Sequence, residues 1–296
     1  MQLAFTLPSF AKINWTLRIL GKRADGFHEL FTVFQTISLH DTLSFEVSDS
    51  LELTCDDESV PTDESNLIIK AAKALQRRSG IEKGVRLQLE KRIPSPGGLG
   101  GGSSNAAVAL IGLKRLWQID ISDDDLQAIA AELGSDVPFF LQGGTAIGTG
   151  RGEIVDPTED KVEQFVLIVT PNERVSTRDA FGRIATRSLT NPDLNRILRV
   201  CRLEAESLDL RHAALINDFE SSVLSAFPEI RRVKDTLLEL GVANAAMSGS
   251  GASVFALFDK QETRQAALKA LDLEINWRKF SVATISRDEY CEALWC

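Results

Sequence analysis

Cysteine and histidine are both scarce in this chain. Its 296 residues include four cysteines, at positions 55, 201, 291 and 296, and three histidines, and no two cysteines are spaced as Cys-x-x-Cys. Because structural zinc sites are built from closely spaced cysteines and histidines, this composition argues against such a site. Scattered cysteines without such a pattern are typical of proteins whose thiols stay reduced, so we expect a cytoplasmic protein.

Long apolar runs and an excess of basic side chains are missing as well. No stretch of about 18 apolar residues could span a membrane, and the start MQLAFTLPSFAKINW has no basic region before a long apolar run, as a secretory signal has. Lysine and arginine number 33 against 42 aspartates and glutamates, a formal net charge of -9. This acidic balance argues against a surface that neutralises a nucleic-acid backbone. We therefore expect neither a membrane partner nor a nucleic-acid partner.

The composition that is present is that of an ordinary globular protein. Apolar residues make up 44% of the chain and charged residues 25%, enough to bury a sizeable core. A chain of this length suits two domains or one large α/β domain. We place a boundary near Asp156 and Pro157, after a glycine-rich run, which predicts domains over 1–157 and 158–296.

Hydrophobic periodicity predicts strands and helices in both halves of the chain. Strands are expected where apolar and polar residues alternate or form a short apolar run, over 37–47, 84–93 and 164–169. Helices are expected where apolar residues recur on one face, over 66–79, 122–134, 212–223 and 227–240. Residues 243–258 fit a strand, a tight glycine loop and a second strand. This interleaving indicates a mixed α/β or α+β architecture.

The loop PSPGGLGGGSS, residues 94–104, holds five glycines and no charged side chain. A flexible linker or a plain turn is the simple interpretation. The loop, however, joins the strand that we expect to end at Ile93 to a helix that we expect over 103–117, and a linker would not join two packed elements so closely. The glycines therefore lie at a strand-to-helix junction.

Such a junction suits a phosphate group. The first N–H groups of a helix have no intrahelical partner, the helix dipole adds partial positive charge, and glycine lets the backbone approach an anion closely. Ser103 and Ser104 add hydroxyls that can bind phosphate or magnesium. A Walker A loop is excluded because the Gly-Lys pair at Gly21 lacks the rest of that motif. A dinucleotide fingerprint fails because its third glycine is replaced by Ser103 or Asn105.

Five segments resemble known kinases. The pattern Pro-x-x-x-Gly-Leu-Gly-x-Gly-Ser-Ser over 94–104 is similar to the phosphate loop of the superfamily that contains galactokinase, homoserine kinase and mevalonate kinase. FAKINW (10–15) and AMSGSGASVF (246–255) resemble two further motifs of that superfamily in the expected order. GKRADGFHEL (21–30) and LGSDVPFFLQGG (133–144) narrow the resemblance to the 4-diphosphocytidyl-2-C-methyl-D-erythritol kinase family.

This resemblance implies an α+β fold of two domains, with the nucleotide and substrate cleft between them. It implies a kinase that uses ATP and Mg²⁺ to phosphorylate the free hydroxyl of a CDP-linked sugar alcohol, in the non-mevalonate route to isoprenoid precursors. The expected partner is thus a small molecule, and we expect a monomer or a weak homodimer. Two positions depart from the family: Phe27 stands where a tyrosine is usual, and Phe10 where a proline is usual.

Lys12 and Asp136 are the catalytic residues that the resemblance implies. Lys12 lies in an otherwise apolar segment, where a lysine needs a partner. Asp136 follows an expected helix end and precedes the apolar run Val-Pro-Phe-Phe. An ion pair between the two would keep the Asp136 carboxylate charged beside the acceptor hydroxyl. Both a base that takes the proton and a carboxylate that only orients the hydroxyl are compatible with this pattern.

The resemblance also implies the binding residues. Substrate contacts are expected at Asn14, Phe27, His28 and Phe181, with the two phenylalanines stacking on cytosine and the histidine bonding to its edge. ATP contacts are expected at Pro94, Ser95, Pro96, Gly97, Gly98, Leu99, Gly100, Gly101, Gly102, Ser103, Ser104, Asn66 and Lys91. The loop 248–251 is expected to frame the cleft from the second domain.

Two other functions stay open. The first is another kinase of the same superfamily, acting on homoserine, mevalonate or a sugar, because only the segment 21–30 and the acceptor side separate these enzymes. The second is a catalytically inactive, nucleotide-binding regulatory paralogue. The presence of both Lys12 and Asp136 argues against an inactive protein.

Overall fold

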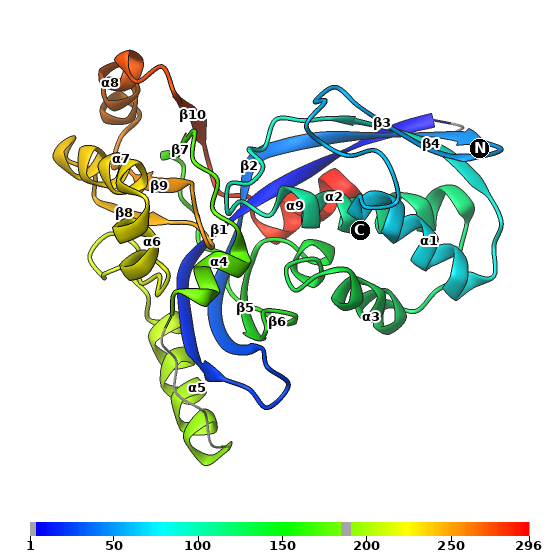
Figure 1. Cartoon of the computed structure of the whole chain (residues 1–296), viewed down its shortest axis with the longest axis horizontal. Helices are drawn as coiled ribbons and strands as arrows, with labels where there is room; N and C mark the ends of the chain where they lie inside the picture. Colours follow the sequence, from blue (N-terminus) through cyan, green and yellow to red (C-terminus); the bar gives the residue numbers. More distant parts are fainter. Residues whose placement is uncertain (1–3, 185–190, 296) are drawn as a thin grey trace.

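The computed structural model describes residues 4–184 and 191–295, which form two β-sheets flanked by helices (Figure 1). The first sheet contains β1 (Ala4–Lys22), β2 (His28–Ser48), β3 (Leu51–Cys55), β4 (Gly84–Glu90), β5 (Thr145–Gly150) and β6 (Ile154–Pro157). The second sheet contains β7 (Val166–Pro171), β8 (Asn244–Met247), β9 (Val254–Leu257) and β10 (Trp277–Val282). The division between the sheets thus falls between β6 and β7.

Helices cover one face of the first sheet and lie beside the second (Figure 1). Those beside the first sheet are α1 (Leu67–Ser79), α2 (Gly101–Trp117), α3 (Asp123–Leu133), the short 3₁₀ helix η1 (Pro138–Leu141) and α9 (Arg287–Leu294). Those beside the second sheet or the end of the β1–β2 hairpin are α4 (Thr177–Gly182), α5 (Asn191–Glu206), α6 (Glu220–Ala226), α7 (Pro228–Glu239), α8 (Gln261–Ala270) and η2 (Leu271–Leu273). Within the described residues, none of these helices is long and apolar enough to cross a membrane.

The strand β2 organises the first sheet. It pairs antiparallel with β1 along nearly its whole length, and on its other side it pairs with β4 over 42–48 and with β5 over 30–35. The β1–β2 register shifts between Phe10 and Ala11 and again between Asn14 and Thr16. Irregularities of this kind bend a strand and re-aim its side chains. Residues 11–14, which include Lys12, therefore form a short regular stretch between two irregular points.

The last helix returns to the first half of the molecule. Tyr290 and Leu294 of α9 are buried in the same core as Phe10, Phe139 and Phe140. The Tyr290 hydroxyl donates a hydrogen bond to the Phe140 carbonyl oxygen at 2.6 Å. The domain boundary between 157 and 158 stays a prediction. The helix α9 follows this boundary in the sequence but packs against the first sheet, which lies before the boundary.

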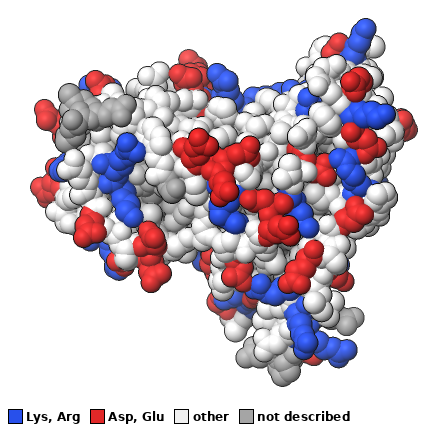
Figure 2. All heavy atoms as spheres, turned by 180° about the vertical axis from the view of Figure 1, so that it is seen from behind, with Lys and Arg blue, Asp and Glu red and all other residues white. Residues whose placement is uncertain are grey.

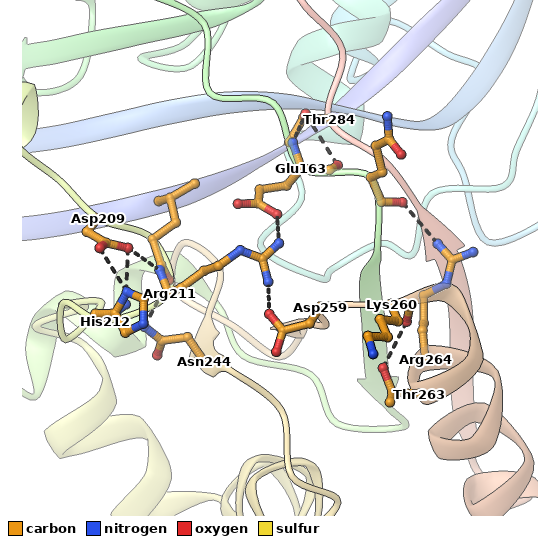
Figure 3. Close-up of polar contacts among 12 residues, drawn as sticks. Glu163, Asp209, Arg211, His212, Asn244, Asp259, Lys260, Thr263, Arg264 and Thr284 are labelled. Carbon is orange, nitrogen blue, oxygen red and sulfur yellow. Dashed lines mark hydrogen bonds and ion pairs between the residues drawn. The ribbon is translucent and has the colours of Figure 1, made fainter.

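A polar cluster lies where the chain passes from the first sheet to the second (Figure 3). The Glu163 N–H donates to Thr284 Oγ1 at 2.8 Å, and the Thr284 N–H donates to the Glu163 carbonyl oxygen at 2.9 Å. The Arg211 guanidinium bridges the carboxylates of Glu163, at 2.5 Å, and Asp259. Burial raises the pKa of the Glu163 carboxyl despite the attraction of Arg211. These contacts join the segment before β7 to the segments around β9 and β10.

The strands predicted over 84–93, 164–169 and within 243–258, and the helices predicted over 66–79, 122–134 and 227–240, are confirmed, with small differences at their ends. The strand predicted over 37–47 is confirmed only as the second half of β2, which already begins at His28. The strand expected to reach Ile93 ends at Glu90, and the helix expected from residue 103 begins at Gly101. Asn66 and Ser122 cap their helices with side-chain oxygens, as helix-start residues of these types commonly do.

The helix predicted over 212–223 is wrong for most of its length, because α6 begins at Glu220. The segment before it runs beside β1 instead. The Leu17 N–H donates to the Ile216 carbonyl oxygen at 2.7 Å, and the Asp218 N–H donates to the Leu17 carbonyl oxygen at 2.9 Å. Backbone pairing with a distant strand has therefore replaced the helix that the local periodicity favours.

The surface carries both signs of charge. On the face turned away from the view of Figure 1, acidic and basic side chains lie intermingled, in many places next to one another (Figure 2). The ion pairs of the described residues include Arg232 with Glu229 at 2.8 Å and with Glu274 at 2.6 Å. Exposed pairs of this kind contribute little to stability individually, about 0–1 kcal/mol each.

Candidate active site

Two glycines of the 94–104 loop adopt backbone conformations that other residues rarely adopt. Gly98 has φ +71° and Gly100 has φ +72°, both in the left-handed region. A Cβ on Gly98 would lie 2.1 Å from the Ser248 carbonyl oxygen, and a Cβ on Gly100 would lie 2.8 Å from Cζ of Phe140. The close approach of these neighbours explains why glycine occupies both positions.

The loop leads directly into the N-terminus of α2. The first hydrogen bond of the helix runs from the Ser104 N–H to the Gly100 carbonyl oxygen at 2.9 Å. The N–H groups of Gly101, Gly102 and Ser103 precede this bond, so the helix itself offers them no acceptor. No acidic side chain lies in the first turn. Uncommitted donors at the positive end of a helix, without a competing carboxylate, form a site suited to an anion.

A cavity of about 350 Å³ opens beside the loop. Its walls come from both halves of the chain. The first half contributes Lys12, Asn14, Thr32, Phe34, residues 94–103, Asp136 and Arg151, and the second half contributes Val175, Thr177, Phe181, Phe219 and residues 249–251. The cavity therefore lies between the elements of the two sheets.

The predicted ion pair between Lys12 and Asp136 is present at one side of this cavity. Lys12 Nζ lies 3.5 Å from Asp136 Oδ2, and the lysine side chain is 4% exposed while the aspartate side chain is 34% exposed. The same ammonium donates to Asn14 Oδ1 at 2.8 Å and to the Gly98 carbonyl oxygen at 3.1 Å. A buried cation is thus fully partnered, and the carboxylate beside it faces the cavity.

The late glycine motif, the segment AMSGSGASVF over 246–255, holds the 94–104 loop from the other side. The Ser248 hydroxyl donates to the Gly98 carbonyl oxygen at 2.9 Å, and the Ser253 N–H donates to the Gly97 carbonyl oxygen at 3.1 Å. The Gly249 N–H donates to Asn14 Oδ1 at 3.0 Å. Three segments that are far apart in the sequence therefore meet through direct hydrogen bonds around Lys12.

Aromatic side chains gather at the other side of the cavity. The rings of His28 and Phe181 are stacked, with centroids 4.9 Å apart and planes 11° apart. Phe181 lines the cavity, whereas His28 and Phe27 lie next to it rather than in its lining. Phe27 is 54% exposed, and the guanidinium carbon of Arg151 lies 5.0 Å from its ring centroid. Burial, and secondarily the charge of Lys22, lowers the pKa of His28 below its usual 6.5.

Three of the expected ATP-binding residues lie outside the cavity lining. Ser104 is fully buried, and within the described part of the chain its Oγ has no hydrogen-bond partner. Asn66 caps α1 by accepting a hydrogen bond from the Ile68 N–H at 2.8 Å. Lys91 Nζ is paired with Asp41 Oδ2 at 2.8 Å. Asn66 and Lys91 thus have partners within the fold, and Ser104 has no exposed surface. Contact of these three residues with ATP stays a prediction.

Two residues that the sequence did not predict belong to the site. Arg151 places a cation in the cavity lining from the turn between β5 and β6. Its position between Gly150 and Gly152 is a signal that could have been used, because a cation in a glycine turn can approach an anionic ligand. Asn217 donates to the carbonyl oxygens of Met247 and Gly249 at 2.7 and 2.8 Å, which fixes the late glycine motif. No local pattern marks Asn217, because its partners are 30 and 32 residues away.

The chain matches protein families of one kind over both halves. The model described as "GHMP kinases N terminal domain" matches residues 66–144, and the one described as "GHMP kinases C terminal" matches residues 187–274. The 4-diphosphocytidyl-2-C-methyl-D-erythritol kinase of Chlorobium phaeobacteroides (strain BS1) is 43% identical over 266 residues, 89% of this chain and 92% of the relative. That of Thermodesulfovibrio yellowstonii is 40% identical over 267 residues, 89% of this chain and 93% of the relative.

Solved structures agree with these matches. A crystal structure of 4-(cytidine 5'-diphospho)-2C-methyl-D-erythritol kinase superposes with a TM-score of 0.76 at 31% identity, covering 95% of this chain and 99% of the other. A homoserine kinase from Cytophaga hutchinsonii superposes with a TM-score of 0.69 at 22% identity, covering 98% and 97%, which supports the fold alone. The expected α+β kinase fold is confirmed. The chain belongs to the GHMP kinase family, and to the branch of it that contains the 4-diphosphocytidyl-2-C-methyl-D-erythritol kinases.

Proposed function

We propose that this chain is an ATP-dependent kinase that transfers a phosphoryl group to the free hydroxyl of 4-diphosphocytidyl-2-C-methyl-D-erythritol and forms its 2-phosphate. The reaction belongs to the non-mevalonate route to isoprenoid precursors. One observation carries the proposal: Lys12 Nζ contacts both the phosphate loop, at the Gly98 carbonyl oxygen, and the Asp136 carboxylate, at 3.1 and 3.5 Å. The groups needed for phosphoryl transfer to an alcohol are thus adjacent.

The phosphate loop is the proposed site of the ATP phosphates. The N–H groups of Gly101, Gly102 and Ser103 donate to phosphate oxygens, and the dipole of α2 favours their negative charge. Such fixed donors stabilise the charge that the transferring group carries in the transition state.

The Asp136 carboxylate is the proposed partner of the acceptor hydroxyl. It accepts a hydrogen bond from that hydroxyl and orients the oxygen toward the γ-phosphorus of ATP. As the new O–P bond forms, the bond from this phosphorus to the bridging oxygen breaks, ADP leaves, and the hydroxyl proton leaves along the hydrogen bond to Asp136. The ammonium of Lys12 pairs with the Asp136 carboxylate at 3.5 Å and neutralises charge near the transferring group. Asn14 holds the ammonium in place through the 2.8 Å bond to its Oδ1.

The oxygen groups beside the loop fit a magnesium ion bound together with ATP. In the described residues, no group of three or more histidine, cysteine or acidic side chains could hold a metal by itself. Magnesium in kinases commonly takes one or two protein oxygens and completes its shell with phosphates and water. The Ser103 hydroxyl, in the cavity lining, would hold it together with the phosphates of ATP. Bound Mg²⁺ would supply positive charge to the phosphates.

The aromatic side of the cavity is the proposed site of the cytidylyl group. The exposed ring of Phe27 offers a stacking face for cytosine, which needs no phenol. Phe181 lines the cavity and offers a second face, while the neutral ring of His28 can bond to the base edge. Arg151 lines the cavity and its guanidinium lies 5.0 Å from the centroid of the Phe27 ring, so it is the cation proposed to bind the diphosphate. A two-domain division at 157/158, a cytoplasmic location and a monomeric or weakly dimeric state complete the proposal.

The test is a coupled assay of ADP release with ATP, Mg²⁺ and four alcohols in turn: 4-diphosphocytidyl-2-C-methyl-D-erythritol, homoserine, mevalonate and galactose. Turnover with the cytidylyl compound alone supports the proposal. Turnover with another alcohol would keep the kinase but replace its acceptor. ATP binding without turnover on any of the four would favour a regulatory protein.

A further inference from the structure

A fully buried carboxylate outside the cavity accepts four hydrogen bonds. Asp41 on β2 has no exposed surface. Its Oδ1 accepts from the N–H groups of Arg92 and Ile93 at 2.7 and 2.8 Å. Its Oδ2 accepts from Lys91 Nζ at 2.8 Å and from Asn105 Nδ2 at 3.1 Å. None of these residues lines the cavity.

The four donors come from the two ends of the phosphate loop. Lys91, Arg92 and Ile93 directly precede Pro94, where the loop begins, and Asn105 directly follows Ser104, where it ends. Lys91 Nζ also donates to the Ile93 carbonyl oxygen, so the entry to the loop is bonded twice. One carboxylate on a neighbouring strand thus fixes the chain where it enters the loop and where it continues into α2.

We propose that Asp41 is a positioning residue of the kinase, whose carboxylate holds the two ends of the phosphate loop so that the loop backbone is set for phosphate before ATP binds. The inference rests on the proposed function, because it assumes that the loop binds the phosphates of ATP. Asp41 touches neither reactant and acts through the loop.

The composition of the loop explains why its ends need fixing. Five of its eleven residues are glycines, and glycine loses more backbone freedom on ordering than any other residue. If the loop is already ordered before ATP binds, this loss of conformational entropy does not reduce the free energy of ATP binding. The two contacts of Gly97 and Gly98 with the late glycine motif hold the middle of the loop, and Asp41 holds its ends.

Fold stability alone gives a poor reason for a buried pair of charges at this place. The side chains of Asp41 and Lys91 are 0% and 5% exposed. Removing two such charges from water is so costly that apolar residues of similar size often serve stability as well or better. A carboxylate, however, can accept from four donors at once, which no apolar side chain can do.

The primary test is Asp41→Asn, which keeps the size of the side chain. The asparagine side chain has one acceptor oxygen in place of two. Either the N–H groups of Arg92 and Ile93, or the side-chain donors of Lys91 and Asn105, therefore lose their acceptor. We expect the dissociation constant of ATP, measured by calorimetry, to rise about ten- to a hundredfold, as for the loss of hydrogen bonds to a charged group. The KM for ATP rises with it, while kcat at saturating ATP and the KM for the alcohol change little.

Glu163→Gln is the matched control. Glu163 is also a buried carboxylate bonded to a cation, Arg211, but it lies in the cluster of Figure 3 and outside the cavity lining. This variant loses the same charge and a comparable buried pair. We expect it to bind ATP as the unmodified protein does, even if it unfolds at a lower temperature.

Two further variants separate positioning from folding. Asp41→Leu combined with Lys91→Met removes both buried charges, so we expect it to regain stability, which would show that the fold does not need the pair. Because Lys91 is itself an expected ATP contact, weak ATP binding is credited to the loss of positioning only if Asp41→Asn and Asn105→Leu show it too. Asn105→Leu leaves the Asp41–Lys91 pair intact and frees only the α2 end, so it should fold and still weaken ATP binding. The inference is overturned if a folded variant binds ATP with an unchanged dissociation constant. This holds for Asp41→Asn, for Asp41→Leu combined with Lys91→Met, and for Asn105→Leu. Absence of ATP binding by the unmodified protein would instead overturn the proposed function.

Discussion

Lys12 shows what sequence and structure each contribute at the scale of the residue. A lysine in an apolar segment needs partners, and this reasoning, together with the resemblance that pointed to Asp136, predicted the ion pair that the structure contains. It could not predict that Asn14 and the Gly98 carbonyl oxygen also bind the ammonium. Those contacts depend on two strand irregularities and on a loop 86 residues away. Residue type therefore revealed the need for a partner, and tertiary structure selected the partners.

Replacing Asp136 by asparagine should remove most turnover while leaving ATP bound. An amide cannot take the hydroxyl proton, and general acid–base groups contribute about 10²- to 10⁴-fold to rates. Steady-state kinetics and ATP calorimetry measure the two effects separately. Glu132→Gln, an exposed carboxylate on α3 outside the cavity lining, is the matched control and should change neither. Unreduced turnover in Asp136→Asn would remove Asp136 from the mechanism.

His28 gives a prediction for pH. Burial holds its pKa below the usual 6.5, so the ring is neutral at pH 6.5 and above and can bond to the cytosine edge. The KM for the cytidylyl substrate should be constant above pH 6.5 and rise only below it. Because the folded pKa is lowered, the stabilisation due to the neutral ring is present above pH 6.5 and is lost as the pH falls through the folded value.

The control for this pH profile is His28→Gln, which bonds without titrating. In His28→Gln, the KM for the cytidylyl substrate should not rise below pH 6.5. A KM that begins to rise above pH 6.5 in the unmodified protein, or an acid rise that persists in His28→Gln, would show that another group is responsible.

At the scale of the element, local patterns predicted what local forces decide. The helices α1 and α3 were predicted because the apolar spacing is a local signal, and their capping residues Asn66 and Ser122 are local as well. The helix over 212–223 failed because hydrogen bonds with β1 override local periodicity there. The 94–104 loop was predicted in part. Its position at a strand-to-helix junction was predicted from local signals, but the contacts that hold it come from β2 and from the late glycine motif, which are distant in the sequence.

Two glycine substitutions in the loop should have opposite effects on stability. Gly102→Ala lies on the exposed start of α2, and its Cβ would meet only Leu67 Cδ1, at 3.8 Å. It should therefore gain up to about 1 kcal/mol of folding free energy, as alanine does in helices, but weaken ATP binding because the methyl group enters the phosphate site. Gly98→Ala, with φ +71° and its Cβ 2.1 Å from a carbonyl oxygen, should lose stability.

Urea titrations and ATP calorimetry on both variants check this prediction. Gly102→Ala that binds ATP as tightly as the unmodified protein would mean that the start of α2 does not contact the phosphates. Gly98→Ala with unchanged stability would contradict the backbone geometry of the loop.

At the scale of the whole molecule, the cavity depends on both sheets and on a helix from the end of the sequence. The sequence predicted interleaved strands and helices and a division near residue 157, where the first sheet ends. It gave no sign that α9 packs into the core of the first sheet, since a short amphipathic segment carries no information about which face it will cover. Tyr290 joins this helix to η1, which directly follows the turn that carries Asp136.

Replacing Tyr290 by alanine should destabilise the first half of the molecule, although the residue lies near the end of the chain. The ring is fully buried beside Phe10, at a centroid distance of 5.6 Å, and removing a buried aromatic ring costs about 3–5 kcal/mol. Tyr290→Phe, which keeps the ring and loses the hydroxyl that donates to the Phe140 carbonyl oxygen, should cost about 1–2 kcal/mol. Urea unfolding measures both, and a loss below about 1 kcal/mol for the alanine variant would mean that α9 is not part of this core.

The most direct measurement of the central claim is phosphorus NMR of a reaction that contains the protein, ATP, Mg²⁺ and 4-diphosphocytidyl-2-C-methyl-D-erythritol. We expect the ATP resonances to be replaced by those of ADP and one new phosphomonoester, while the diphosphate of the cytidylyl compound persists. Formation of ADP with inorganic phosphate alone, or no change in the ATP resonances, would contradict phosphoryl transfer to this alcohol.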